Sequence, residues 1–152
     1  MINNNFSNSD SKASQFATVS KSKPLQCLAI GRMEKEKGIH FAIQAIANLP
    51  KNQQKNVLLN VVGEGNYLPR LRQIAADLGV GEVVIFHGRA DDNLLNEIYH
   101  RSRIHLMPTT RQEGLPLTIL EGMAYGLATI ASDIGGIPGV ITNDVDGILV
   151  RP

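Results

Sequence analysis

Short runs of apolar residues, rich in Val, Ile and Leu, recur along the chain from residue 25 onward. Branched aliphatic runs of this length, separated by turn-forming residues, are typical of strands in the middle of a sheet. We therefore predict six strands, over Leu25–Ile30, Val57–Val62, Val83–Phe86, Ile104–Met107, Thr129–Ala131 and Ile148–Val150.

Between most of these runs, the apolar residues follow the three- and four-residue spacing of a helix face. Glycines 79 and 126 stand where helices commonly end, and Asp91 and Asp92 are candidates to cap a helix start. Pro116 suits the first turn of a helix. These signals predict four helices, over residues 41–49, 68–78, 94–99 and 117–124.

Strand–helix alternation of this kind predicts the fold class. It favours an α/β domain with a doubly wound, mainly parallel sheet and helices on both faces. In such sheets, ligands bind at the carboxyl ends of the strands. The loops to inspect are therefore those that follow the predicted strands, over residues 31–38, 63–66, 87–91, 108–116 and 132–138.

The ends of the chain differ from its middle. Residues 1–24 are mostly polar, so we predict a disordered lead or linker there and one α/β domain over residues 25–152. Only Arg151 and Pro152 follow the last predicted strand. Because a doubly wound sheet normally covers such a strand with a helix, we expect a fragment truncated at its C-terminal helices.

Composition narrows the function classes. Hydrophobic residues make up 43% of the chain, which is enough for a core, and 15 Lys and Arg against 14 Asp and Glu exclude a strongly basic nucleic-acid binder. A single cysteine, Cys27, excludes a disulfide framework within the chain. No apolar run approaches the length of a membrane span, and the N-terminus does not resemble a secretory signal. We expect a cytoplasmic protein.

The loop after the first strand offers Arg32 and Lys37 and closes on Gly38 at a predicted helix start. Two cations beside free backbone N–H groups suit a diphosphate. An exposed charged loop in which Glu34 and Glu36 neutralise these bases is an equal alternative.

Gly63 and Gly65 follow the second strand and allow close approach of a ligand to the backbone. Leu68 stands where the third glycine of a dinucleotide fingerprint belongs, and the chain contains no phosphate-loop motif. A simple tight turn is the alternative here, as a flexible turn is for the paired glycines 135 and 136 after the fifth strand.

The loop after the fourth strand carries the most chemistry. Glu113 lies in this loop, and Glu121 lies about one turn inside the next predicted helix, on a helix that we expect to be buried. The helix dipole and the free backbone N–H groups at its start favour a phosphate, and a carboxylate nearby can bind two vicinal hydroxyls of a ribose. The N–H groups concerned are those of Gly114, Leu115, Leu117 and Thr118. A capping or surface role for Glu113 is the alternative.

Five segments occur along the chain in an order and spacing that are highly specific: Gly31-Arg32 with Lys37-Gly38, Val62–Gly65, Glu113 and Glu121 separated by seven residues, Ala131–Pro138, and Asp146–Val150. Over residues 25–152 the chain thereby resembles the C-terminal, donor-binding domain of the retaining glycosyltransferases of family 4. The resemblance implies the Rossmann-like C-terminal half of a two-domain GT-B fold. It also implies transfer of a sugar from a nucleotide diphosphate donor, with no cofactor and no metal.

The resemblance further implies individual roles. Arg32 and Lys37 match the diphosphate-binding pair, and Glu113 matches the glutamate that faces the transferred sugar as the catalytic residue. Glu121 matches the glutamate that binds the ribose. The backbone from Gly114 to Leu117 would contact sugar and phosphate, and Arg89, with the nearby Gly63 and Gly65, would lie beside the base.

Family frequency favours a UDP-sugar, with GDP and ADP open. The acceptor, a glycan or a lipid-linked glycan, would bind mainly to an N-terminal domain missing from this chain, which would make the chain alone inactive. The full-length enzyme could then associate peripherally with a membrane; no nucleic-acid partner is implied.

Two alternatives stay open. One is a non-catalytic nucleotide-sugar-binding or regulatory module that pairs with a separate chain. The other is a hydrolase that uses Glu113 and Glu121 as paired carboxylates, which would leave Arg32 and Lys37 without a role.

Overall fold

The structure is a computed structural model that describes residues 23–152. The predicted lead over residues 1–24 therefore lies almost wholly outside the described residues, and its disorder stays a prediction. Within the described part, all six predicted strands are present, with ends shifted by at most two residues. They are β1 (Leu25–Ile30), β2 (Val57–Val62), β3 (Val84–Gly88), β4 (Ile104–Met107), β5 (Ala128–Ser132) and β6 (Gly147–Val150).

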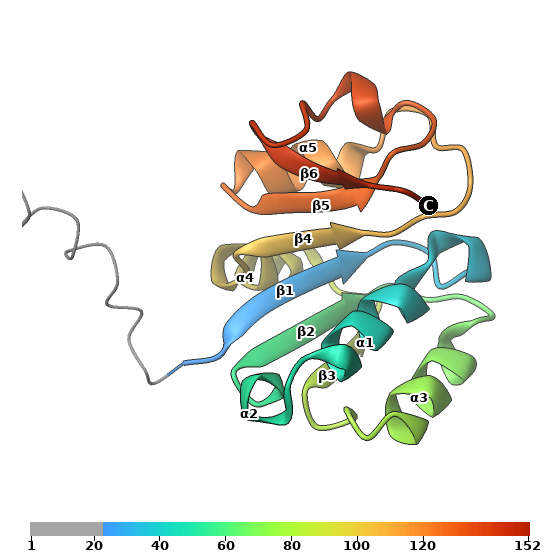
Figure 1. The fold of residues 1–152 in the computed structure, drawn as a ribbon, viewed down its shortest axis with the longest axis vertical. Coiled ribbons are helices and arrows are strands. Elements are labelled where there is room, and N and C mark those ends of the chain that lie inside the picture. The colour runs from blue at the N-terminus through green and yellow to red at the C-terminus, as the bar shows by residue number, and fades with distance from the viewer. Residues whose placement is uncertain (1–22) are drawn as a thin grey trace, which may run out of the picture.

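The strands form one sheet in the order β3-β2-β1-β4-β5-β6, and every pair of neighbouring strands is parallel (Figure 1). The order reverses between β1 and β4, because β1 connects toward β2 on one side while β4 connects toward β5 on the other. This arrangement confirms the predicted doubly wound α/β fold. It also places a topological switch point where the loops after β1 and β4 leave the sheet in opposite directions.

The four predicted helices are present and slightly longer at their ends in two cases. They are α1 (Ile39–Asn48), α3 (Leu68–Asp77), α4 (Asp92–Arg101) and α5 (Leu117–Ala124). A short α2 (Lys51–Gln54) and two single 3₁₀ turns, Lys35–Lys37 and Ile137–Gly139, were not predicted. Segments of three or four residues are too short to show a hydrophobic period.

The predicted helix ends have the expected local chemistry. The Asp91 carboxylate accepts a hydrogen bond from the Leu94 backbone N–H at 2.9 Å and so caps α4. Gly79 follows α3 with a φ of 68°, a left-handed conformation that glycine adopts at little cost.

Helices cover both faces of the sheet (Figure 1). On one face, α1 and α3 pack on the β1–β2 region through a core that includes Ile43, Leu59 and Leu71. On the other face, α4 packs against Leu28 of β1. Helix α5 lies on the same face: its Gly122 contacts the side chain of His105, which is the register partner of Leu28 on β4. Each face thus has its own apolar core.

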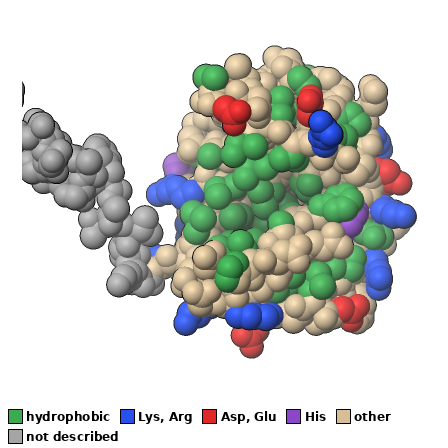
Figure 2. Space-filling view, viewed as in Figure 1, with side chains coloured by type: hydrophobic (Ala, Val, Ile, Leu, Met, Phe, Trp, Pro, Cys, Tyr) green, Lys and Arg blue, Asp and Glu red, His purple; other side chains and the backbone are tan. Residues whose placement is uncertain are grey.

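One part of the sheet has no helix over it in the described chain. Leu106, Ile130 and Ile148 are register partners across β4, β5 and β6, and they lie on the face that carries α1. Ile148 is 47% exposed, and hydrophobic side chains gather at the centre of this view of the surface (Figure 2). No helix within residues 23–152 has the length and apolar character needed to cross a membrane.

Candidate functional site

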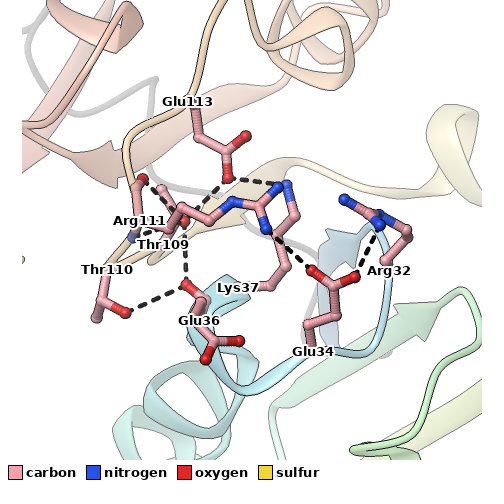
Figure 3. Close-up of polar contacts among 8 residues, drawn as sticks. All are labelled: Arg32, Glu34, Glu36, Lys37, Thr109, Thr110, Arg111 and Glu113. Carbon is pink, nitrogen blue, oxygen red and sulfur yellow. Dashed lines mark hydrogen bonds and ion pairs between the residues drawn. The ribbon is translucent and has the colours of Figure 1, made fainter.

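Two loops from β1 and β4 meet at the switch point. The Thr110 backbone N–H donates to the Glu36 carbonyl at 2.8 Å, and the Thr109 hydroxyl lies 3.1 Å from the same oxygen (Figure 3). Gly38 permits this approach, since a Cβ there would lie 1.7 Å from the Pro108 carbonyl oxygen. The close contact fixes the side chains of both loops relative to one another.

Lys37 and Glu113 form the centre of the site. Lys37 Nζ lies 2.8 Å from Glu113 Oε1, and the side chains are only 18% and 12% exposed. Thr109, which is fully buried, places its Oγ1 3.0 Å from the same carboxylate oxygen (Figure 3). The sequence predicted both charged residues as site residues, and the structure brings them into direct contact although 76 positions separate them.

Arg32 lies in a second, more exposed cluster next to this pair. Its guanidinium is 2.8 Å from Glu34 Oε1, and Arg111 approaches the other oxygen of Glu34 at 3.3 Å (Figure 3). The sequence left open that glutamates of the same loop neutralise Arg32 and Lys37. This is the case for Arg32, which pairs with Glu34, but not for Lys37, whose partner Glu113 comes from the loop after β4. Exposed ion pairs of this kind are weak and readily exchanged.

Positive charge is in excess at the two loops. Three cations, Lys37, Arg32 and Arg111, contact only two carboxylates, Glu34 and Glu113. Since such a cluster can take up further negative charge, the arrangement suits an anionic ligand.

The start of α5 follows Glu113 directly. No side chain caps this helix, so its first-turn N–H groups, including those of Leu117 and Thr118, have no acceptor from a capping side chain. A Cβ built at Gly114 would meet no atom within 4 Å. The side chains of Leu115 and Leu117 are 62% and 63% exposed, so the backbone, not these side chains, is what the structure offers beside the ion pair.

Glu121 lies on α5, and in the described structure it forms no hydrogen bond or ion pair with Lys37 or Glu113. The expectation that it sits on a buried helix is wrong: α5 buries only Ile119 and Gly122 fully, while Glu121 is exposed. The helix lies at the surface because it packs on the sheet through one narrow stripe. The Glu121 carboxylate accepts a hydrogen bond from the Tyr99 hydroxyl at 2.8 Å.

Gly63 and Gly65 serve the packing of the loops after β1 and β2. A Cβ at Gly63 would lie 1.9 Å from the Gly31 carbonyl oxygen, and one at Gly65 would lie 2.5 Å from the Met33 carbonyl oxygen. Each glycine therefore has a structural reason for its place. Arg89 is exposed and directly follows Gly88. The Gly88 carbonyl accepts a hydrogen bond from the Gly63 N–H at 2.7 Å, so Arg89 and Gly63, both predicted to lie near the nucleotide base, are close to one another.

The paired glycines after β5 support the Glu113 loop. The Gly136 N–H donates to the Glu113 carbonyl at 2.8 Å, and a Cβ at Gly135 would lie 2.4 Å from that oxygen. Their role is close backbone packing, which differs from the flexible turn considered above. The loops after β4 and β5 are thereby fixed to one another.

Sequence reasoning missed four side chains of the site: Glu34 as a bridge between arginines, Thr109, Arg111 and Tyr99. Tyr99 falls on the apolar stripe of a predicted helix, and its hydroxyl partner is 22 residues away. The position of Arg111 and Thr109 in the loop after β4 was the only signal available for them.

In the described part of the chain, no three His, Cys, Asp or Glu side chains gather in a way that could hold a metal ion. The prediction that the reaction needs no metal was made from a resemblance and stays a prediction.

Fold and site together define a class: a Rossmann-like domain with a cluster of charged side chains at the switch point of its sheet. The sequence profile described as "Glycosyl transferases group 1" matches residues 10–152, and the chain belongs to this family.

Individual proteins agree with this assignment. The chain is 30% identical over 125 residues to an uncharacterized glycosyltransferase of Methanocaldococcus jannaschii, covering 82% of this chain and 31% of that protein. The crystal structure of WaaG, a glycosyltransferase involved in lipopolysaccharide biosynthesis, superposes with a TM-score of 0.77 at 25% identity over 86% of this chain and 34% of WaaG. The pneumococcal O-GlcNAc transferase GtfA, in complex with UDP and GlcNAc, gives 0.74 at 26% identity over 86% and 25%.

These comparisons show the Rossmann-like α/β fold predicted from the sequence, which matches part of the GT-B glycosyltransferase structures. The chain spans about a third of the length of WaaG and of the archaeal relative.

Proposed function

We propose that this chain is the donor-binding half of a retaining glycosyltransferase of family 4. It binds a nucleotide diphosphate sugar, and an N-terminal domain outside this chain supplies most of the acceptor site. The chain is then a hexosyltransferase domain that is inactive without that partner domain.

The observation that carries the proposal is the Lys37–Glu113 ion pair, 2.8 Å long, beside the uncapped start of α5. A diphosphate placed there would exchange Glu113 for a phosphate oxygen as the partner of Lys37. The first-turn N–H groups of α5 and the exposed Arg32 would bind the remaining phosphate oxygens. Released from Lys37, the Glu113 carboxylate would accept a hydrogen bond from a hydroxyl of the sugar.

The same groups suit the chemical step. The bond between the sugar C1 and the diphosphate oxygen breaks, and negative charge grows on the departing diphosphate. Lys37, Arg32 and the α5 N-terminus are placed to stabilise that charge. The acceptor hydroxyl forms the new C1–O bond on the same face of the sugar and passes its proton to the leaving phosphate, so the anomeric configuration is retained.

UDP is the nucleotide that we propose for the donor. Support comes from GtfA, which is solved with UDP and GlcNAc bound. Glu121 would bind the ribose hydroxyls, and Arg89 would lie beside the base. The involvement of WaaG in lipopolysaccharide biosynthesis supports a glycan or lipid-linked acceptor. We further propose that the full-length enzyme is cytoplasmic and contacts a membrane peripherally.

Calorimetric titration of the chain with UDP, GDP and ADP tests the proposal. We expect UDP to bind at micromolar to low millimolar affinity and to bind most tightly of the three. A Lys37→Ala variant should lose most of this affinity, because it removes the mostly buried cation. Lys55→Ala changes an exposed lysine away from the two loops and should bind like the wild type.

Each other result has a clear meaning. A folded chain that binds none of the three nucleotides contradicts a donor site carried by this domain. Tight binding without sugar transfer by the protein at its full length would instead favour the non-catalytic module.

A further inference from the structure

Tyr99 connects the apolar core of α4 to a carboxylate at the surface of α5. The residue is 2% exposed and packs with Leu28, Ile98 and Leu127, so its ring belongs to the core beneath the helices. Its hydroxyl nevertheless reaches Glu121 Oε2 at 2.8 Å. A core role alone would be met equally well by phenylalanine.

The ring of Tyr99 is held from its other side by Tyr125. The two rings stack with centroids 4.7 Å apart and planes 10° from parallel. The ring stack, which phenylalanine at position 125 would preserve, fixes Tyr99, whereas the Tyr125 hydroxyl makes a separate contact, donating to Asn96 Oδ1 at 2.7 Å. The Tyr99 hydroxyl is therefore a donor at a fixed position.

Glu121 needs such an anchor if it is to bind a sugar. Its side chain is exposed, and among residues 23–152 the hydrogen bond from Tyr99 is the one that its carboxylate makes. That bond engages Oε2 and leaves Oε1, which has two lone pairs and can accept two hydrogen bonds, for a ligand. Burial and the neighbouring Glu121 carboxylate raise the pKa of the Tyr99 phenol, which keeps it protonated as a donor.

We propose that Tyr99 is a positioning residue that holds the Glu121 carboxylate in the orientation that accepts hydrogen bonds from two vicinal ribose hydroxyls. The inference rests on the ribose role of Glu121 in the proposed function. Tyr99 does not touch the nucleotide itself: it lowers the loss of side-chain freedom that Glu121 would otherwise suffer on binding.

The test compares UDP with 2′,3′-dideoxy-UDP, which lacks both ribose hydroxyls, on the wild-type chain and on Tyr99→Phe. We expect Tyr99→Phe to weaken UDP binding roughly three- to tenfold, the scale of one lost hydrogen bond. Binding of the dideoxy nucleotide should be unchanged. Glu121→Ala should weaken UDP binding at least as much, and adding Tyr99→Phe to it should cause no further loss.

Tyr125→Phe is the matched control. It removes a hydroxyl from the same aromatic stack, one that contacts Asn96 and not Glu121, and should leave both affinities as in the wild type. Thermal melting of each variant verifies that the fold is intact.

Two results overturn the inference alone: UDP affinity unchanged in Tyr99→Phe, or an equal loss for both nucleotides, which indicates a purely structural role. A wild-type chain that does not distinguish UDP from its dideoxy analogue overturns the ribose assignment of Glu121 and this inference with it. A failure of the proposed ribose role of Glu121 therefore shows already in the wild-type affinities for the two nucleotides, before any variant is considered.

Discussion

Lys37 illustrates how one residue would prepare the proposed site for an anion. Its ammonium group is mostly buried, so the nearby Glu113 carboxylate stabilises it in the protein, and Thr109 holds that carboxylate from the other side. A buried charge left without a partner would be costly. The pair is therefore suited to an exchange in which a phosphate replaces the carboxylate and the positive charge stays balanced throughout.

Arg32 gives a prediction at the same scale. Arg32→Ala should weaken UDP binding roughly tenfold, because a charge-assisted hydrogen bond to the diphosphate is lost, and should leave uridine binding unchanged. Titrations monitored by NMR chemical shifts can follow both the strong and the weak ligand.

Arg111→Ala is the control for Arg32→Ala, since both arginines are exposed and both contact Glu34. We expect it to have the smaller effect on UDP. Equal losses for UDP and uridine in Arg32→Ala would refute the diphosphate role, and equal losses in the two arginine variants would point to a general positive field.

At the scale of elements, the site depends on loops that touch through their backbones. The β1 loop meets the β4 loop at Gly38 and Pro108, and the β5 loop meets the β4 loop at Gly136 and Gly114. Glycine is required at positions 38 and 136 because a side chain there would occupy the position of a neighbouring carbonyl. Three loops from separate strands thereby hold Glu113 and the start of α5 in place.

Gly136→Ala tests whether the backbone contact between the β4 and β5 loops is needed. The new Cβ would lie 2.2 Å from the Gly114 carbonyl oxygen, so the β4 loop must shift. We expect a loss of about 1–3 kcal/mol in the free energy of unfolding, as in other overpacked sites, together with weaker UDP binding. Urea unfolding and calorimetry measure the two effects.

Gly139→Ala is the matched control, because a Cβ there meets nothing within 4 Å and the residue lies in the 3₁₀ turn of the same segment. It should be close to wild type in both measurements. If Gly136→Ala also left both the free energy of unfolding and UDP binding unchanged, the close contact between the β4 and β5 loops would not matter for the site.

At the scale of the whole molecule, the core contains polar groups that packing does not satisfy. His105 on β4 is fully buried, and neither of its ring nitrogens has a hydrogen-bond partner in the structure; its register partner Thr129 on β5 also buries an unpartnered hydroxyl. Burial lowers the pKa of His105 from 6.5 to about 4. The folded protein therefore keeps this imidazole neutral where the unfolded chain binds a proton.

The consequence is a stability that falls with acidity. Above pH 6.5 neither state protonates His105, whereas between pH 6.5 and about 4 only the unfolded state does, so stability is lost as the pH falls through that window. The loss in the free energy of unfolding that is attributable to this residue is about 3 kcal/mol. Urea unfolding at pH 7.5 and pH 4.5 should show it in the wild type and not in His105→Leu.

His100→Gln, which removes an exposed imidazole, serves as the control and should retain the full pH dependence of the wild type. A His105→Leu variant that loses as much stability as the wild type between the two pH values would contradict the account.

The comparison of sequence with structure is clearest at the strands and at Glu121. All six strands were predictable because buried parallel strands are short, continuous apolar runs with turn residues at their ends. Helix α2 was not, because four residues show no period. Glu113, Lys37 and Arg32 were expected on one edge of the sheet because the loops after parallel strands converge there, and the structure places them on these loops. The buried setting expected for Glu121 was wrong, since α5 has one narrow face on the sheet.

The sequence by itself determined the alternation of strands and helices, the edge of the sheet that carries the site and the family that the chain resembles. These follow from local patterns of polarity and from residue types that stand close together in the chain. Only the tertiary structure decided which side chains are partners: Lys37 with Glu113, Glu34 with Arg32 and Arg111, and Glu121 with Tyr99. The physical reason is that most of these contacts join loops and helices far apart in sequence, and their geometry is set by how the sheet is wound and how closely its glycines let the loops approach.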